Sequence, residues 1–123
     1  MSKLKKYGAG LIISSVVFAT SAEATGFWLT GKITRTLTDS IYYSGCMVLM
    51  NTPVGNGGNL CPTNGWVSLD CKALFNGNDV EGGMRMFSTA TSAAMAGKTV
   101  SLYINDSNRV NGYCVASRID VIY

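Results

Sequence analysis

Apolar and polar side chains alternate along several short segments of the chain, which is the pattern of strands that bury one face. The clearest segment is 98–105, where Val100, Leu102 and Ile104 are each separated by a single residue. In the last segment the alternation predicts one inward face, made of Val115, Ser117, Ile119 and Val121. Strands are predicted over 31–37, 46–50, 66–71, 98–105 and 113–123.

Between the third and fourth of these strands the hydrophobic period lengthens to three or four residues, the period of an α-helix with one buried face. The predicted buried stripe consists of Met84, Phe87, Thr91, Ala94 and Met95. Asn78 and Glu81 have the spacing of a capping box at the start of a helix. Because two glycines follow and weaken the first turn, the helix is expected to begin near Met84 and to end at Gly97.

The predicted order is therefore strand, strand, strand, helix, strand, strand. A helix between the third and fourth of five strands is typical of the OB-fold, a small five-stranded barrel. Closing so few strands buries their apolar faces and limits exposed strand edges. We therefore predict a mainly β domain with one helix, built as an OB-fold-like five-stranded barrel. A generic α+β layer is the alternative.

The beginning of the chain has the layout of a secretory signal peptide. Lysines near the start precede a stretch without charged residues at 8–20, and the small side chains of Ala22 and Ala24 suit a signal peptidase. The apolar part of this stretch is shorter than the roughly 20 residues of a membrane span, which argues against an anchor. Residues 1–24 are expected to be removed, which leaves a single domain at 25–123, secreted or periplasmic and without a membrane span.

Charge and composition exclude several classes of function. Seven basic and six acidic side chains follow Ala24, so the mature chain has a net charge of +1, too small for a surface that binds nucleic acid or anionic membranes. The chain contains no histidine, which removes Ser-His and Cys-His catalytic pairs. A Gly-rich phosphate loop is also missing from the sequence. We therefore expect no enzyme activity, no cofactor, no metal ion and no nucleic-acid partner.

Four cysteines follow the expected cleavage site: Cys46, Cys61, Cys71 and Cys114. An even number of cysteines in a small exported domain predicts two disulfides. A four-cysteine zinc site is the alternative. Its ligands normally come as close Cys-x-x-Cys pairs, however, and these four cysteines are widely spaced.

The predicted topology favours one disulfide pairing. If the second and third strands are antiparallel with Met50 opposite Val67, Cys46 faces Cys71. The third and fifth strands of an OB-fold run parallel, and this brings the two remaining cysteines together as a Cys61–Cys114 bond. The pairing in simple chain order, Cys46–Cys61 with Cys71–Cys114, stays open, because a register error of one residue flips every side chain.

The segment 86–104 runs from a helix through Gly97 and a polar residue into an alternating strand. In this order and in its overall topology, the chain resembles the B subunits of bacterial toxins with a five-membered binding ring, in particular the subtilase-cytotoxin and pertussis-like branch. The resemblance implies a disulfide-bearing OB-fold, a homo-oligomer (a pentamer) and binding of cell-surface glycans. No glycan-contacting residue of that family matches a position here, so none is carried over. The segment 111–121 is also similar to small uncharacterised exported bacterial proteins, a resemblance that implies no toxin function.

Aromatic side chains are the candidates for ligand binding, because the C–H faces of sugar rings stack on aromatic planes. The candidates are Trp28, Trp66 and Tyr103. The competing interpretation is that both tryptophans plug the ends of a barrel and that Tyr103 lies at a subunit interface. Arg118 and Asp120 share a strand face and are expected to be solvated charges. Two functions follow: an oligomeric glycan-binding module similar to a toxin B subunit, or an exported structural or interaction protein that binds another protein.

Overall fold

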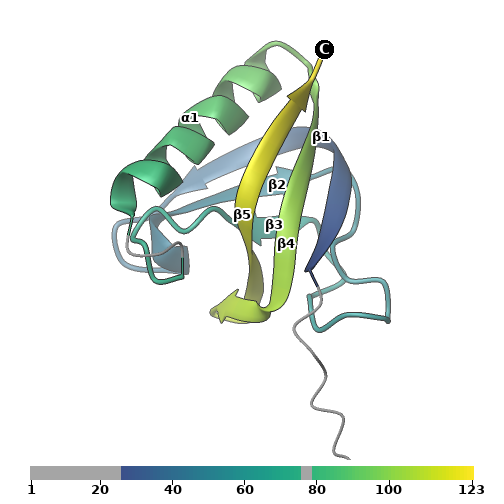
Figure 1. Ribbon diagram of the computed structural model, residues 1–123, viewed down its shortest axis with the longest axis vertical. Coiled ribbons are helices and arrows are strands. Elements are labelled where there is room, and N and C mark those ends of the chain that lie inside the picture. Colours follow the sequence, from purple (N-terminus) through teal and green to yellow (C-terminus); the bar gives the residue numbers. More distant parts are fainter. Residues whose placement is uncertain (1–25, 76–78) are drawn as a thin grey trace, which may run out of the picture.

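The computed structural model of the chain describes residues 26–75 and 79–123 (Figure 1). The expected signal peptide at 1–24, its cleavage site and Asn78 lie outside these residues. The described chain forms five strands, one α-helix and a short 3-10 turn: β1 (Gly26–Thr38), η1 (Tyr43–Gly45), β2 (Cys46–Met50), β3 (Trp66–Ser68), α1 (Val80–Met95), β4 (Thr99–Val110) and β5 (Tyr113–Ile122).

The five strands join in a closed ring in the order β1-β2-β3-β5-β4, and α1 lies against this ring (Figure 1). The long β1 pairs with β4 through its first half and with β2 through its second half. A register shift between Ile33 and Arg35 marks the change of partner. β3 and β5 run parallel, with Ser68 opposite Val115. The predicted mainly β domain, with one helix after the third strand and two disulfides, is confirmed.

Three strand boundaries differ from the prediction by more than one residue. β1 begins at Gly26 because its first residues pair with β4, and β4 continues to Val110 because it forms a hairpin with β5. β3 already ends at Ser68. After it, Asp70 has a left-handed backbone (φ 56°) and its carbonyl accepts a hydrogen bond from the amide of Ala73 at 3.0 Å, which closes a turn. The boundaries are set by the partner strands and by this turn. Alternation along the sequence gives no information about either of them.

The hydrophobic core fills the inside of the ring. Its completely buried members on the strands and the segment after β3 include Val48, Val67, Leu69, Val100, Leu102 and Ile104. Helix α1 adds Ala90 and Ala93 to this core. Removal of this apolar surface from water is the main term that stabilises the fold.

The predicted inward face of β5 is wrong at Ser117, which is exposed. In the β4–β5 pair, Tyr103 lies opposite Arg118 but Ile104 lies opposite Ala116, so Ser117 is the extra residue of a bulge. The residues of β5 that face the core on the two sides of this bulge are Cys114, Ala116, Ile119 and Val121. Val115, also predicted to be inward, is buried but lies outside this core cluster.

Helix α1 begins at Val80, earlier than predicted. Asp79 caps it, because its side chain accepts a hydrogen bond from the amide of Gly82 at 3.0 Å. Gly83 lies where the helix comes close to the turn after β3, and a Cβ atom there would lie 2.5 Å from the carbonyl oxygen of Asp70. The glycine that weakens the helix in isolation is therefore required by the packing.

The predicted buried stripe of α1 is displaced around the helix. Met84 and Met95 are 51% and 85% exposed, and Phe87, Thr91 and Ala94 are only half-buried. The buried positions are Gly83, Ala90 and Ala93. Small side chains on this face let the helix backbone approach the sheet, and the long methionine side chains remain outside the contact.

Both disulfides have the pairing that the topology favours. In the first, the Cα atoms of Cys46 and Cys71 are 5.6 Å apart. The predicted register between β2 and β3 is nevertheless wrong by two residues, since Val48, and not Met50, lies opposite Val67. A shift of two residues keeps every side chain on its own face, so Cys71 still reaches Cys46.

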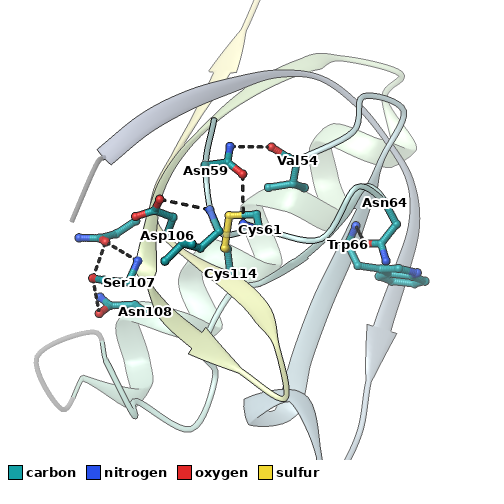
Figure 2. The surroundings of a disulfide bond; sticks show 11 residues. Val54, Asn59, Cys61, Asn64, Trp66, Asp106, Ser107, Asn108 and Cys114 are labelled. Carbon is teal, nitrogen blue, oxygen red and sulfur yellow. Dashed lines mark hydrogen bonds between the residues drawn. A yellow bond between two sulfur atoms is a disulfide. The ribbon is translucent and has the colours of Figure 1, made fainter. Parts of the chain in front are cut away.

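The second disulfide ties the long loop between β2 and β3 to β5 (Figure 2). Cys61 of this loop is bonded to Cys114, and the side chain of Asn59 accepts a hydrogen bond from the amide of Cys61 at 3.1 Å. The next amide towards the N-terminus, that of Leu60, donates to the buried carboxylate of Asp106 on β4 at 3.3 Å. The loop is therefore fixed to both strands of the β4–β5 hairpin.

Candidate functional site

Two of the three aromatic candidates lie side by side on the outer face of the ring. Trp28 on β1 lies opposite Tyr103 on β4, and the neighbouring Leu29 and Leu102 are buried in the core. The two ring centroids are 5.2 Å apart and the ring planes are inclined by 56°. This geometry is typical of an attractive aromatic pair. Trp28 is 48% exposed, so the pair presents aromatic surface to solvent.

Arg118 extends this pair onto a third strand. It lies opposite Tyr103 in the β4–β5 register, and its guanidinium carbon is 5.3 Å from the centroid of the Trp28 ring. Arg118 donates hydrogen bonds to both carboxylate oxygens of Asp120, at 2.8 and 3.1 Å. These hydrogen bonds, together with the negative charge of Asp120, raise the pKa of Arg118 above its ordinary value. The guanidinium is thus held in one orientation over the indole ring.

A row of hydroxyl groups runs beside the aromatic residues. Thr30 on β1 lies opposite Ser101 on β4, which in turn lies opposite Asp120 on β5. The hydroxyl oxygens of Thr30 and Ser101 are 2.7 Å apart and share a hydrogen bond. We define the Trp28 surface as the six residues Trp28, Thr30, Ser101, Tyr103, Arg118 and Asp120. One positive and one negative side chain cancel, so this surface is neutral and combines aromatic rings with hydrogen-bonding groups.

Trp66, the third candidate, lies apart from the Trp28 surface. It is half-buried on β3, and the guanidinium carbon of Arg35 is 5.6 Å from the centroid of its ring. A pocket, here called the Trp66 pocket, is lined by Leu37, Tyr43, Met47, Trp66 and Tyr113. Neither Trp28 nor Trp66 packs against the core cluster, which contradicts their interpretation as plugs of a barrel.

Sequence reasoning identified only two of the six residues of the Trp28 surface, Trp28 and Tyr103. Arg118 and Asp120 were expected to be solvated charges, and the hydroxyl groups of Thr30 and Ser101 carried no expectation. A spacing of two residues on one strand was the only available signal for the Arg118–Asp120 pair. The rest depends on which strands are neighbours, because residues far apart in the sequence meet only through the β1–β4 and β4–β5 registers.

The described residues contain no cluster of His, Cys, Asp or Glu side chains that could hold a metal ion. No helix within them is long and apolar enough to cross a bilayer. No family model, curated protein or solved structure matches the chain.

Proposed function

We propose that this chain is an exported OB-fold module that binds neutral glycans through the Trp28 surface and acts as a homo-oligomer, secreted or in the periplasm. The strand order, with a helix after β3 and a parallel β3–β5 pair, supports the OB-fold. Two disulfides support an oxidising compartment. The oligomer and the glycan class follow the resemblance to ring-forming toxin B subunits. A binding role, and not catalysis, is proposed because the chain has no histidine.

The exposed indole of Trp28 beside Tyr103 is the observation that carries this function. Trp28, which is 48% exposed as a residue, offers apolar surface that the C–H face of a sugar ring can cover. The hydroxyls of Thr30 and Ser101 lie in the adjacent row. A hydroxyl both donates and accepts hydrogen bonds, as the hydroxyls of a sugar do.

The charges of the surface favour a ligand without net charge. Asp120 engages Arg118 through both of its carboxylate oxygens. An anionic ligand at Arg118 would have to compete with this carboxylate, whereas a neutral sugar hydroxyl can accept from the remaining guanidinium hydrogens. Binding should therefore depend weakly on salt, because few ions are displaced.

Several copies would compensate for the modest affinity of one flat site. A single aromatic platform with a few exposed hydrogen bonds gives weak binding, whereas linked sites on one assembly raise the overall avidity by about 10²–10⁴. Native mass spectrometry of the mature protein tests the oligomer. A five-membered ring is expected from the resemblance, and a monomer at all concentrations would remove this part of the proposed function.

A glycan array probed with the mature protein tests the ligand class. We expect binding to neutral glycans that is lost in Trp28→Ala and retained in the matched variant Trp66→Ala, with the melting temperature of each variant measured in parallel. The proposed function fails if the wild type binds no glycan, or if Trp28→Ala binds as the wild type does.

A protein partner on the same surface is the second candidate function. Trp, Tyr and Arg are the residues most enriched among binding hot spots in protein interfaces, and Trp28, Tyr103 and Arg118 lie together. Loss of a protein complex in Trp28→Ala, together with an empty glycan array, would favour this candidate.

A further inference from the structure

The Trp66 pocket lies on the outer face of the ring and shares no residue with the Trp28 surface. Leu37, Met47 and Trp66 come from the neighbouring strands β1, β2 and β3, and Met47 is only 2% exposed. Tyr43 and Tyr113 meet edge to face, with ring centroids 5.8 Å apart and planes inclined by 73°. The pocket therefore has an aliphatic and thioether floor with aromatic walls.

One wall of the pocket is held by a strained turn. Tyr43, Ser44 and Gly45 have φ angles of 59°, 53° and 89°, all in the left-handed region. Only the glycine adopts this region without cost, and each of the other two residues costs about 1–3 kcal/mol. Such strain persists only where the surrounding structure imposes it, and it is concentrated at ligand sites and switch regions.

Buried polar contacts impose this conformation. Ser44 donates its hydroxyl hydrogen to the completely buried carboxylate of Asp70, and the hydroxyl of Ser68 donates to the carbonyl oxygen of Tyr43 at 3.1 Å. The amide of Lys72 donates to the carbonyl oxygen of Ser44 at 3.0 Å. The Cys46–Cys71 disulfide links the residue after the turn to the residue after Asp70. The position of Tyr43 is thus fixed before any ligand arrives.

Charge distinguishes this pocket from the Trp28 surface. Arg35 lies over the ring of Trp66, with its guanidinium carbon 5.6 Å from the ring centroid. Among the residues that the structure describes, no carboxylate forms an ion pair with Arg35, whereas Arg118 is paired with Asp120. A ligand that fills the pocket can therefore place a negative charge against Arg35 without displacing an acidic side chain.

We propose that the Trp66 pocket docks a partner protein through a peptide segment in which an apolar side chain stands next to an acidic residue. The apolar side chain would enter between Tyr43 and Trp66, and the acidic residue would pair with Arg35. A sugar is less suitable here, because no amide, carboxylate or aliphatic hydroxyl lines the pocket. Methionine, aromatic residues and arginine are instead the residues enriched in protein interfaces.

Nuclear magnetic resonance separates this site from the glycan site, because the chain has only two tryptophans. The probe is a panel of short peptides that pair Leu, Met or Pro with Asp, with matched peptides that carry Lys for Asp or Gly for the apolar residue. We expect the Asp-containing apolar peptides to shift the indole N–H signal of Trp66 and to leave that of Trp28 unchanged. Glycans that occupy the Trp28 surface should shift the Trp28 signal alone.

Three variants define the contribution of the pocket. Trp66→Ala should weaken peptide binding more than about tenfold, as for an interface hot spot. Arg35→Gln, an exposed change, should weaken the Asp-containing peptides up to about fivefold and should not weaken the Lys peptides. Trp28→Ala is the matched control and should bind the peptides as the wild type does. If Trp66→Ala does not fold, the Arg35→Gln result alone decides.

Each contrary result overturns the inference whether or not the Trp28 surface binds glycans. Equal binding of Asp and Lys peptides would remove the role of Arg35. A Trp66 signal that responds to glycans but to no peptide would make this a sugar site. Self-association of the protein that Trp66→Ala abolishes would show that a second copy of the chain occupies the pocket.

Discussion

The guanidinium of Arg118 lies over the ring of Trp28, 5.3 Å from its centroid, although the two residues are on strands that do not pair with each other. Tyr103 on the strand between them is opposite both residues in the two registers. The contact therefore crosses the full width of β4. Asp120 fixes the guanidinium in this position, so Asp120 is a positioning residue for the Trp28 surface.

Substitution of Asp120 tests this relationship. In Asp120→Asn the guanidinium of Arg118 loses its carboxylate partner, and the Trp28 surface gains one positive charge. We expect weaker binding of neutral glycans and new, salt-sensitive binding of acidic glycans, because an unpaired guanidinium recognises carboxylates well. Glycan arrays at low and high salt measure both effects. An unchanged glycan profile would mean that Asp120 does not position Arg118 for binding.

A methyl group at Gly26 should disable the surface without disturbing the core. A Cβ atom there would lie 1.8 Å from the hydroxyl oxygen of Tyr103, so Gly26→Ala must push the Tyr103 ring aside. The displaced atoms are the far end of an outer side chain. We therefore expect loss of glycan binding with little change in melting temperature, and retained binding would show that the position of Tyr103 is unimportant.

The fold could largely be predicted from the sequence, because alternation and helical period report burial directly. Five strands and one helix in the fourth place follow from this. The disulfide pairing also required the assumed strand order, and it was favoured correctly only because the error of two residues in the register kept every side chain on its own face. The β-bulge at Ser117 could not be predicted, since the inserted residue interrupts the period on which the prediction depends. The requirement for glycine at position 83 could not be predicted either. The close approach of the helix to Asp70 is a tertiary contact, and it overrides the low helix propensity of glycine.

The candidate sites were less predictable than the fold. Trp28 and Tyr103 could be chosen individually as exposed aromatic residues, but their contact depends on the β1–β4 register. Tyr43 has a left-handed backbone conformation, which a tyrosine rarely adopts. The hydrogen bond from Ser68 and the neighbours of the turn hold it there. Residue preferences alone predict a relaxed turn there.

Paired glycine substitutions in the first turn of α1 test the close approach of the helix. Gly83→Ala should destabilise the protein by about 1–3 kcal/mol, because its Cβ atom would lie 2.5 Å from the backbone oxygen of Asp70. In the matched variant Gly82→Ala the nearest atom is a side-chain oxygen of Asp79, which can move. Gly82→Ala should therefore be less destabilising than Gly83→Ala, although a shift of the Asp79 side chain weakens the helix cap. Urea unfolding measures both variants, and equal stabilities would place the helix farther from the turn.

Removal of each disulfide should have a different consequence. The Cys46–Cys71 and Cys61–Cys114 bonds close segments with sequence separations of 25 and 53 residues. Loop-closure entropy then predicts losses of about 3.5 and about 4 kcal/mol, respectively, when both cysteines of one bond are replaced by alanine. Removal of the first bond should weaken peptide binding more than removal of the second, because the first bond holds the strained turn at Tyr43 whereas Tyr113 beside Cys114 is also held by the β4–β5 hairpin. Unfolding curves and peptide titrations of the two double variants check both points.

Acid should loosen the Tyr43 wall of the Trp66 pocket through Asp39. The carboxylate of Asp39 accepts hydrogen bonds from the amides of Tyr42 and Ile41, each at 2.7 Å, and these bonds lower its pKa below the ordinary value. A carboxylate with a lowered pKa in the folded state adds stability above its unfolded pKa of about 3.9, and this stability is lost as the pH falls through the folded value.

Peptide binding to the Trp66 pocket should therefore be constant near neutral pH and should decline below a pH of about 3.9. The Asp of the peptide is protonated in the same range, so only the part of the decline that depends on Asp39 tests the Tyr43 wall. The amide signals of Tyr42 and Ile41 should change over the same range, since the hydrogen bonds of both amides end on the Asp39 carboxylate. Asp39→Asn is the matched variant, because its amide oxygen still accepts hydrogen bonds but does not titrate in this range. A decline of equal size and midpoint in Asp39→Asn would assign the acid sensitivity to another group.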